Sequence, residues 1–390
     1  MRLFRKYPTA IVWFLSAIFL LVGNMVASQG MDTFTADDEF AVSTAVVTEI
    51  IERDDWQLEM GSGFFIDNTQ ITFSARITSG DARGQVVIVD QHIDGMLITP
   101  VKEVEVGARV LIFDDYFLGR YTFIDFVRIN YIIILGGVFF VLMVLFGGLK
   151  GLNSIVALGF TCAAIFFVLI PAILGGRNIY AAALIVCVYI IASTLLAVIG
   201  PNRKAVSAML GCLGGVLLAA LLMLFMDVIL NLTGVVDQDS QFLLTLPIDT
   251  PLSLSAVVFA GVIIGAVGAI MDVAMSISSS LWEVNLAGEN MSFRAVYRSG
   301  LNIGRDILGT MLNTLILAYI GSALSLILLL TFYSQGTSLL ELFNREMIAV
   351  ELLRALIGSF GIFLAVPLTS GICGLLYTGR GRRQEYNSSW

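Results

Sequence analysis

Four acidic residues interrupt long apolar runs in this sequence, and they are its first candidates for chemistry. They are Asp227, Asp272, Asp306 and Glu351. If these runs cross a bilayer, an ionised carboxylate at the bilayer centre costs about 2.5–3.5 kcal/mol on insertion scales, so each residue needs a partner or a function. A carboxylate in such a position favours a cation or a proton as its ligand.

Asp272 belongs to a regular pattern of small and polar residues. Spacings of four, three, four, four and three residues place six of them in one stripe along a helix: Gly261, Gly265, Gly268, Asp272, Ser276 and Ser279. The glycines are predicted to pack helices, because they let another helix approach closely. The polar half of the stripe has two interpretations. Its carboxylate and hydroxyls face a cavity, or the stripe ends at the membrane surface and Asp272 only reaches water there.

A second polar group follows Arg305. Asp306, Thr310 and Asn313 share one helix face, and Thr314 lies beside it. In the first turn of a helix, Asp306 would only interact with the helix dipole, for less than about 1 kcal/mol. Asn313 lies about two turns deeper, where a buried amide needs hydrogen-bond partners. Either a site or a neighbouring helix would supply them.

The remaining candidates have simpler explanations. Pro367 lies in an apolar run, where it removes a backbone donor and predicts a broken helix near a site. Glu351 and Arg354 are three residues apart and are expected to pair on one helix face. Asp227 is expected in the last turn of its span. The predicted lining of a substrate or ion pathway is Asp272, Ser276, Arg305, Asp306, Thr310, Asn313 and Pro367.

No catalytic residues and no metal ligands are predicted, and the cofactor is left open. The one histidine, His92, lies outside the apolar runs, which excludes His-based zinc or serine chemistry within them. Two aspartates invite comparison with intramembrane aspartyl proteases, but the Tyr-Asp and Gly-x-Gly-Asp signatures of that class are absent. No phosphate-binding loop or basic aromatic patch is present, so neither ATP nor nucleic acid is an expected ligand.

Four cysteines lie in apolar runs without a Cys-x-x-Cys pair, which is typical of small buried hydrophobic residues. They are Cys162, Cys187, Cys212 and Cys373.

Long apolar helices must position these residues. Of the 390 residues 57% are hydrophobic and only 13% are charged, and the mean hydropathy is +0.90. A soluble domain carries roughly a quarter charged residues, so lipid is the expected solvent for much of the chain. Apolar runs of about 20 residues match a hydrocarbon core of about 30 Å. The sequence predicts an α-helical polytopic membrane protein with about eight transmembrane helices, at residues 10–26, 131–148, 154–174, 179–199, 206–230, 252–274, 307–332 and 355–376.

The first run has two interpretations. Basic residues before it and Ala27-Ser28-Gln29 after it fit a cleaved signal peptide. Trp13 and the long apolar core favour a retained anchor.

Residues 31–127 have a different character, with acidic residues and short alternating β-branched runs. Strands are predicted at 41–51, 70–77, 85–93, 109–113 and 121–127. Asp94-Gly95 is a hairpin signal. Five short strands predict a small all-β barrel of OB or SH3-like size. The expected domains are an anchor (1–30), this β domain (31–127), a seven-helix domain (128–378) and a tail (379–390).

Lys and Arg in short loops predict the orientation. With the N-terminus inside, twelve basic residues lie at cytoplasmic helix ends and two, Arg177 and Arg345, lie outside. The twelve are Arg2, Arg5, Lys6, Lys150, Arg203, Lys204, Arg294, Arg298, Arg305, Arg380, Arg382 and Arg383. Both termini are therefore expected in the cytoplasm and the β domain is expected to be extracytoplasmic.

Four segments of the chain resemble the YibE/F-like family of bacterial multispan membrane proteins. They are GGLKGLNSIVALGF (147–160), GAVGAIMDVAMSISSSLWEV (265–284), IGRDILGTMLNTLILAYIG (303–321) and NREMIAVELLRALIGSFGIFLAVPLT (344–369). The resemblance covers about 130–378 and the preceding anchor-and-domain layout. It implies a bacterial plasma membrane and a homo-oligomer, or a heteromer with a shorter relative that lacks the β domain. It attaches no catalytic role to any residue.

Two functions are expected from these features. The first is a transporter or permease, cation- or proton-coupled, with its polar site in the last three spans. The second is a non-catalytic subunit or sensor of an envelope complex, in which the β domain binds a partner and the helices dock others.

Overall fold

The computed structural model describes residues 8–29, 42–59, 65–80, 82–95, 102–115, 120–245, 252–288, 291–333, 336 and 338–378. The basic residues predicted at 2–6 and 380–383, and the tail at 379–390, lie outside them. The chain divides into two compact units, Thr33–Leu142 on the one hand and Met1–Asp32 with Met143–Trp390 on the other. Each is described by itself.

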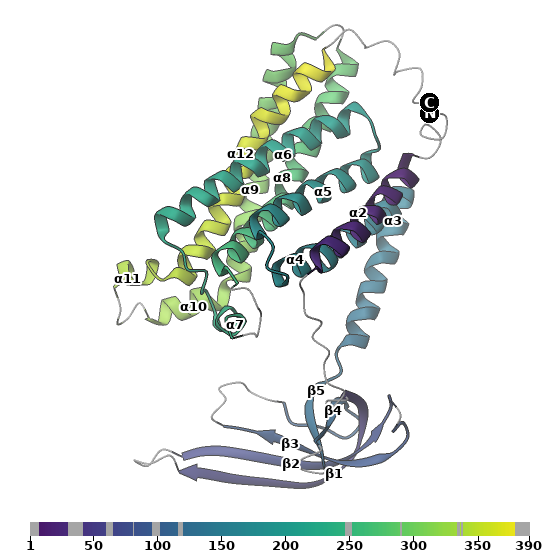
Figure 1. Ribbon diagram of the computed structural model, residues 1–390, viewed down its shortest axis with the longest axis vertical. Coiled ribbons are helices and arrows are strands. Elements are labelled where there is room, and N and C mark those ends of the chain that lie inside the picture. Colours follow the sequence, from purple (N-terminus) through teal and green to yellow (C-terminus); the bar gives the residue numbers. More distant parts are fainter. Residues whose placement is uncertain are drawn as a thin grey trace. The chain divides into compact units, whose positions relative to one another are not determined.

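The first unit contains a closed five-stranded barrel (Figure 1). Its strands are β1 (Val42–Glu59), β2 (Phe65–Ile77), β3 (Val86–Ile93), β4 (Arg109–Asp115) and β5 (Arg120–Phe126). Their order is β1-β2-β3-β5-β4, with β1 also paired to β4, and only the β3–β5 pair is parallel. All five predicted strands are confirmed, and the order is that of the OB-type Greek-key barrel.

Alternating apolar residues fill the barrel. Along β2, Ile71, Phe73, Ala75 and Ile77 are each at most 2% exposed, because side chains of period two point to the same face. The Asp94-Gly95 prediction is wrong, because β3 pairs with β2 and β5 and does not form a hairpin with β4.

The second unit is helical and includes most of α3. The helices are α2 (Pro8–Ala27), α3 (Ile129–Ala164), the π-helix η2 (Ile165–Leu169), α4 (Ile170–Leu174), α5 (Ile179–Ile199), α6 (Arg203–Leu230), α7 (Gln238–Leu243), α8 (Leu254–Ala287), α9 (Phe293–Ser322), α10 (Leu324–Tyr333), α11 (Leu339–Phe343) and α12 (Glu346–Tyr377). In the described residues, seven helical stretches are long and apolar enough to cross a membrane. This is compatible with a multi-pass membrane protein.

One of the seven stretches accounts for the difference from the eight predicted spans. Residues 129–174 form a run of 46 residues, more than twice the length of about 20 that one span requires. Gly148 interrupts it with non-helical torsions (φ 56, ψ −138). This interruption lies where the sequence predicted the boundary between two spans.

The two prolines inside apolar runs behave differently. Pro171 directly follows the π-helical turn η2, at the start of α4; a proline without an N–H is a usual cause of such an irregularity. Pro367 lies within α12, which continues from Glu346 to Tyr377. The broken helix predicted at Pro367 is therefore wrong.

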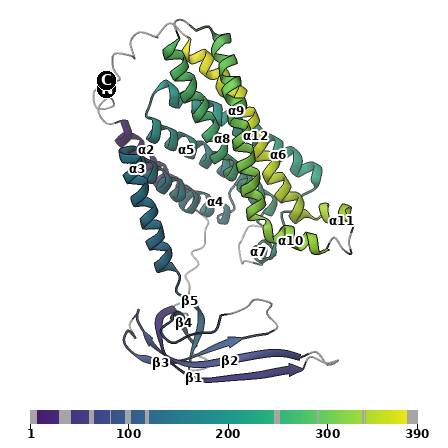
Figure 2. The same cartoon turned by 180° about the vertical axis from the view of Figure 1, so that it is seen from behind.

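Three helices are longer than the sequence predicted. Helix α8 runs to Ala287 instead of 274, α9 begins at Phe293 instead of 307, and α12 begins at Glu346 instead of 355. The additional turns are polar or charged, so the apolar runs did not include them. Helix α12 packs against α6, α8 and α9 (Figures 1 and 2).

Candidate functional site

The polar stripe on α8 lies on the open side of this helix. Gly261, Gly265, Gly268 and Asp272 are exposed, and Ser276 is half-buried. The opposite side of α8 is core, where Ile263, Ile270 and Ile277 are fully buried. Asp272 precedes the end of α8 at Ala287 by about four turns. It therefore lies near the middle of α8, whose 34 residues exceed the length of about 20 that a single span requires.

The predicted packing role of the three glycines does not hold within one chain. A methyl group at Gly261 or Gly268 would meet nothing within 4 Å, and at Gly265 it would meet only the Tyr319 hydroxyl at 3.6 Å. Close contacts occur elsewhere. The Cβ position of Gly211 lies 2.0 Å from Thr369 Oγ1, and that of Gly304 lies 2.3 Å from Val366 Cγ1.

The missed glycines had one sequence signal. Gly300 and Gly304 follow the small-xxx-small spacing of closely packed membrane helices. Both are buried against α12, and the Cβ position of Gly300 lies 2.4 Å from Ser370 Oγ. Thr369 and Ser370 are fully buried in these contacts. The residues around Pro367 thus serve helix packing, and the structure does not bring Pro367 onto the open face with Asp272.

The polar group on α9 is also exposed. Because α9 begins at Phe293, Asp306 lies in the helix interior, so the helix-dipole explanation for it is wrong. Arg305, Asp306, Thr310 and Asn313 are all exposed. The Thr310 hydroxyl donates to the Ile307 carbonyl at 3.0 Å.

The two polar groups lie at similar depth. Helices α8 and α9 are antiparallel: the Cβ position of Gly300 lies 2.9 Å from Leu281 Cδ1, and that of Gly265 lies 3.6 Å from Tyr319 Oη. Interpolation between these two contacts, with the same rise for both helices, places Asp272 roughly level with Thr310. By the same register Ser276 is level with Asp306.

Asp272 and Asp306 differ from the other two acidic candidates, Asp227 and Glu351, in lacking a partner. Glu351 Oε1 accepts from Arg354 Nη1 at 2.7 Å, as predicted. Asp227, in the last turn of α6, accepts a hydrogen bond from Ser255 of α8 at 2.8 Å. In the part of the chain that the structure describes, the side chains of Asp272 and Asp306 form neither an ion pair nor a hydrogen bond.

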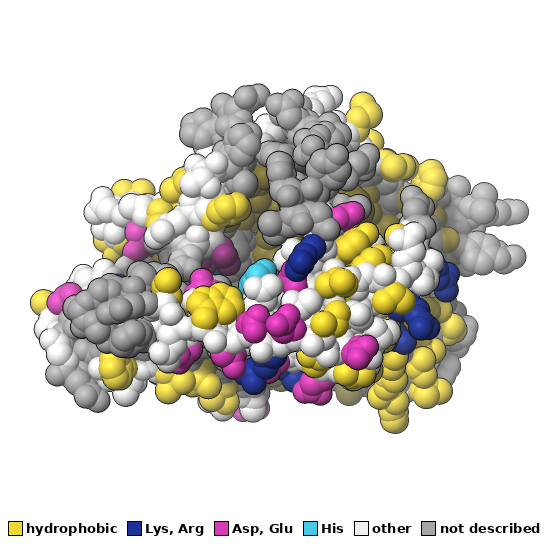
Figure 3. Space-filling model, turned by 90° about the horizontal axis from the view of Figure 1, so that it is seen from below, with side chains coloured by type: hydrophobic (Ala, Val, Ile, Leu, Met, Phe, Trp, Pro, Cys, Tyr) yellow, Lys and Arg dark blue, Asp and Glu magenta, His cyan; other side chains and the backbone are white. Residues whose placement is uncertain are grey.

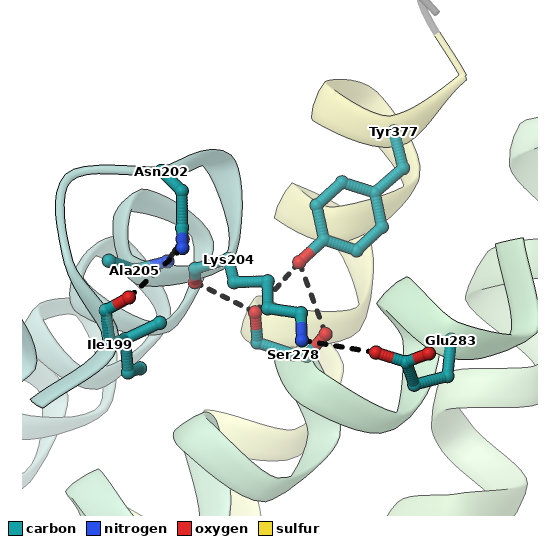
Figure 4. A network of polar contacts seen from close by, with 7 residues as sticks. All are labelled: Ile199, Asn202, Lys204, Ala205, Ser278, Glu283 and Tyr377. Carbon is teal, nitrogen blue, oxygen red and sulfur yellow. Dashed lines mark hydrogen bonds and ion pairs between the residues drawn. The ribbon is translucent and has the colours of Figure 1, made fainter. Parts of the chain in front are cut away.

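A polar cluster that the sequence did not predict joins the ends of α6, α8 and α12 (Figure 4). Ser278 Oγ donates to the Lys204 carbonyl at 2.8 Å and lies 2.7 Å from Tyr377 Oη. Since the Ser278 proton is committed to Lys204, the Tyr377 hydroxyl donates to Ser278. Lys204 Nζ lies 3.2 Å from Glu283 Oε1. Ser278 and Tyr377 are 99 positions apart in the sequence, so no local pattern could predict their contact.

Three of the four cysteines are buried as predicted. Cys187, Cys212 and Cys373 are free and at most 1% exposed, whereas Cys162 is exposed, which corrects the prediction for that residue.

The barrel has a charged surface and one cavity of interest. His92 is exposed, and Figure 3 shows Asp and Glu side chains spread over the same unit. Among the described residues no group of three or more His, Cys, Asp or Glu could hold a metal ion. A cavity of about 580 Å³ is lined by charged and aromatic side chains, among them Lys102, Glu103, Arg109 and Tyr131.

Comparison with known proteins places the helical part in a family. The family model described as YibE/F-like protein matches residues 135–379, more than half of the chain, and the barrel precedes the matched range. No curated protein and no solved structure matches the chain. The chain belongs to the YibE/F-like protein family.

Proposed function

We propose that the chain is a membrane transporter or permease for a cation or a proton, with its site around Asp272 on the open face of α8. One observation carries the proposal. Asp272 is exposed on α8, a helix long and apolar enough to cross a membrane, and has no partner among the described residues. Lipid cannot cover an ionised carboxylate without a cost of about 2.5–3.5 kcal/mol or more. Water, a proton or a cation at this position removes that cost.

The surroundings of Asp272 suit a small cation. Glycine at positions 265 and 268 leaves space beside the carboxylate, and Ser276 adds a hydroxyl one turn away. Carboxylate and hydroxyl oxygens are ligands that hard cations prefer.

The orientation belongs to this proposal. Lys and Arg remain concentrated on one side even without Arg305, which the structure moves into the interior of α9. With the positive-inside rule both termini are cytoplasmic, residues 31–127 are extracytoplasmic, and the membrane is a bacterial plasma membrane. The chain contains no phosphate-binding loop, which favours secondary transport or energy from a partner.

Ion flux into proteoliposomes tests the proposal. The purified full chain is reconstituted, and uptake of H⁺, Na⁺, K⁺, Mg²⁺ and Ca²⁺ is followed with ion-sensitive dyes. We expect Asp272→Asn to lower the supported flux at least tenfold. The matched control is Glu283→Gln on the same helix, whose carboxylate already pairs with Lys204. Flux equal to wild type in Asp272→Asn would refute the site.

A second function rests on the barrel. Its cavity of about 580 Å³, with basic, acidic and aromatic lining residues, favours a binding module for an envelope partner in a non-catalytic subunit or sensor. Absence of flux for all five ions, together with partner binding that is lost when Arg109 and Lys102 are replaced by Ala, would favour this alternative.

A further inference from the structure

The outward face of α9 carries a regular seam. Six exposed residues follow each other at spacings of four, three, four, three and four: Asn302, Asp306, Gly309, Asn313, Ile316 and Ile320. This spacing places the six residues in one line along the helix, as at the core positions of a coiled coil, although only two of the six are apolar. The opposite face of α9 is occupied, because Gly300 and Gly304 are buried against α12. Figure 2 shows α9 on the near side of α12 and α8.

This seam is unlike the other exposed helix faces of the chain. Helices α3 and α10 expose large apolar side chains such as Ile132, Leu145 and Leu328, which lipid covers well. The seam on α9 exposes a carboxylate, two amides and a glycine on a helix that is long and apolar enough to cross a membrane. Polar side chains at this depth face other protein or water. The adjacent opposite charges of Arg305 and Asp306, together with the amide of Asn313, favour protein.

We propose that α9 pairs with α9 of a second copy of this chain, in parallel, around a two-fold axis along the membrane normal. Two copies inserted with the same topology can meet through this helix only in the parallel direction. A two-fold contact uses the same surface on both subunits, so the seam must be complementary to itself.

The seam is complementary to itself at both of its central polar residues, Asp306 and Asn313. In a parallel pair, each knob fits among four residues of the facing helix. With Asp306 and Asn313 at the first core position of their heptads, Asp306 packs beside Arg305 and Gly309 of the second copy. Arg305 is exposed and has no ion pair among the described residues. Two reciprocal Arg305–Asp306 pairs therefore neutralise the acids, which would otherwise repel each other.

Asn313 supplies the specificity of the contact. At its level the two amides face each other across the axis and can exchange hydrogen bonds. A buried Asn at this heptad position fixes register and oligomeric state in two-stranded coiled coils. Gly309, one turn before it, permits the close approach that such a bond needs. A contact with an unrelated protein would require neither the Asn–Asn symmetry nor adjacent opposite charges on one seam.

This inference does not rest on the proposed function. It assigns Asp306 and Asn313 to assembly and leaves Asp272, on α8, as the acid available to a ligand. If the chain dimerises through α9 but supports no ion flux, the dimer inference stands and the proposed transport function is refuted. Flux by a chain that stays monomeric does the reverse.

Disulfide cross-linking in membranes tests the seam. In a background with Cys162→Ser and with the three buried cysteines changed to Ala, single cysteines are introduced as Asn302→Cys, Gly309→Cys and Ile316→Cys. The matched control is Ala318→Cys, which is equally exposed on α9 but on the other side of the helix. We expect mild oxidation to give a species of twice the chain mass at the three seam positions and at least tenfold less at Ala318.

Charge exchange provides a second measurement in the otherwise wild-type chain. Two differently tagged copies are co-expressed and co-purified, and the mass is measured in nanodiscs. We expect Arg305→Asp to lower co-purification at least tenfold and the double variant Arg305→Asp, Asp306→Arg to restore it, while Asp272→Asn has no effect. A monomer at all concentrations, equal cross-linking at Ala318, or cross-links only to a different protein would overturn the inference.

Discussion

The contact between α6 and α12 allows a quantitative prediction for Gly211→Ala. A methyl group on Gly211 would lie 2.0 Å from Thr369 Oγ1, 2.8 Å from its Cβ and 2.9 Å from its Cα. Rotation of the Thr369 side chain moves Oγ1 but leaves Cβ and Cα in place. Since carbon atoms prefer separations of about 3.5–4.0 Å, the two helices must separate locally by roughly 0.7–1.2 Å.

A second variant, Gly261→Ala, separates the cost of overpacking from the gain in helix propensity. Overpacking of this kind costs about 1–3 kcal/mol, while replacing Gly by Ala in a helix returns up to about 1 kcal/mol. Gly261→Ala has the same propensity gain, but nothing lies within 4 Å of its Cβ position. The difference between the two variants therefore isolates packing. For a helical unit of this size, it corresponds to roughly 2–12 °C in Tm.

The buried cysteines supply the assay. Cys187, Cys212 and Cys373 are at most 1% exposed, so a thiol-reactive fluorophore labels them only when the helices come apart. Cys162 is exposed and labels at the start of the experiment, which sets the baseline. All variants are heated at one scan rate, because unfolding of such chains is commonly irreversible. Equal Tm values for Gly211→Ala and Gly261→Ala would refute the α6–α12 contact at Thr369.

Two further changes test the polar contacts. Tyr377→Phe removes the hydroxyl that donates to Ser278, and we expect a loss of about 0.5–1.5 kcal/mol in the same thiol assay; unchanged stability, as expected for exposed Tyr131→Phe, would contradict the cluster. The hydrogen bond from Arg128 lowers the pKa of Asp125, so the charged form stabilises the folded barrel above the ordinary pKa of about 3.9, and this contribution is lost as pH falls through the lowered pKa. Both groups are exposed, so Asp125→Asn should lower the stability of the barrel by less than about 1 kcal/mol at pH 7, and wild type and variant should become equally stable below about pH 4. Hydrogen exchange of β5 peptides in the full chain measures this difference in stability, and a difference that does not change with pH would refute the prediction.

Local patterns predicted the elements well. The five strands were visible because alternation of period two depends only on neighbouring residues, and α5 has the predicted bounds because its apolar run ends at Gly200. The start of α9 was missed for the opposite reason. Arg294 and Arg298 break the apolar run there, although the Ser292 cap and the following turns are helical.

Non-local features were beyond the sequence. Gly211 and Thr369 are in contact, yet nothing near either residue indicates the other. The Ser278–Tyr377 hydrogen bond has the same character. Pro367 shows a related limit, because a helix packed on three sides continues through a proline that would end an isolated one.

The candidate site was predicted as a set of residues but not as a surface. The sequence placed Asp272 and Asp306 together because both interrupt apolar helices, and the structure confirms neither a closed pocket nor a bond between them. The structure shows instead that the two aspartates have different neighbours. Asp306 has Arg305 beside it on a seam with heptad spacing, so a second copy can neutralise it.

Asp272 has no basic residue on its stripe, which continues to Ser276, Ser279 and the acidic Glu283. A contact between two copies of this stripe, like the one proposed for α9, would therefore bring no positive charge to the Asp272 carboxylate. A carboxylate in that position is stable only if it holds a proton, reaches water or binds a cation. Each of these three states makes Asp272 responsive to ions at the membrane, and this is why it remains the central residue of the proposed transport site after Asp306 has been assigned to assembly.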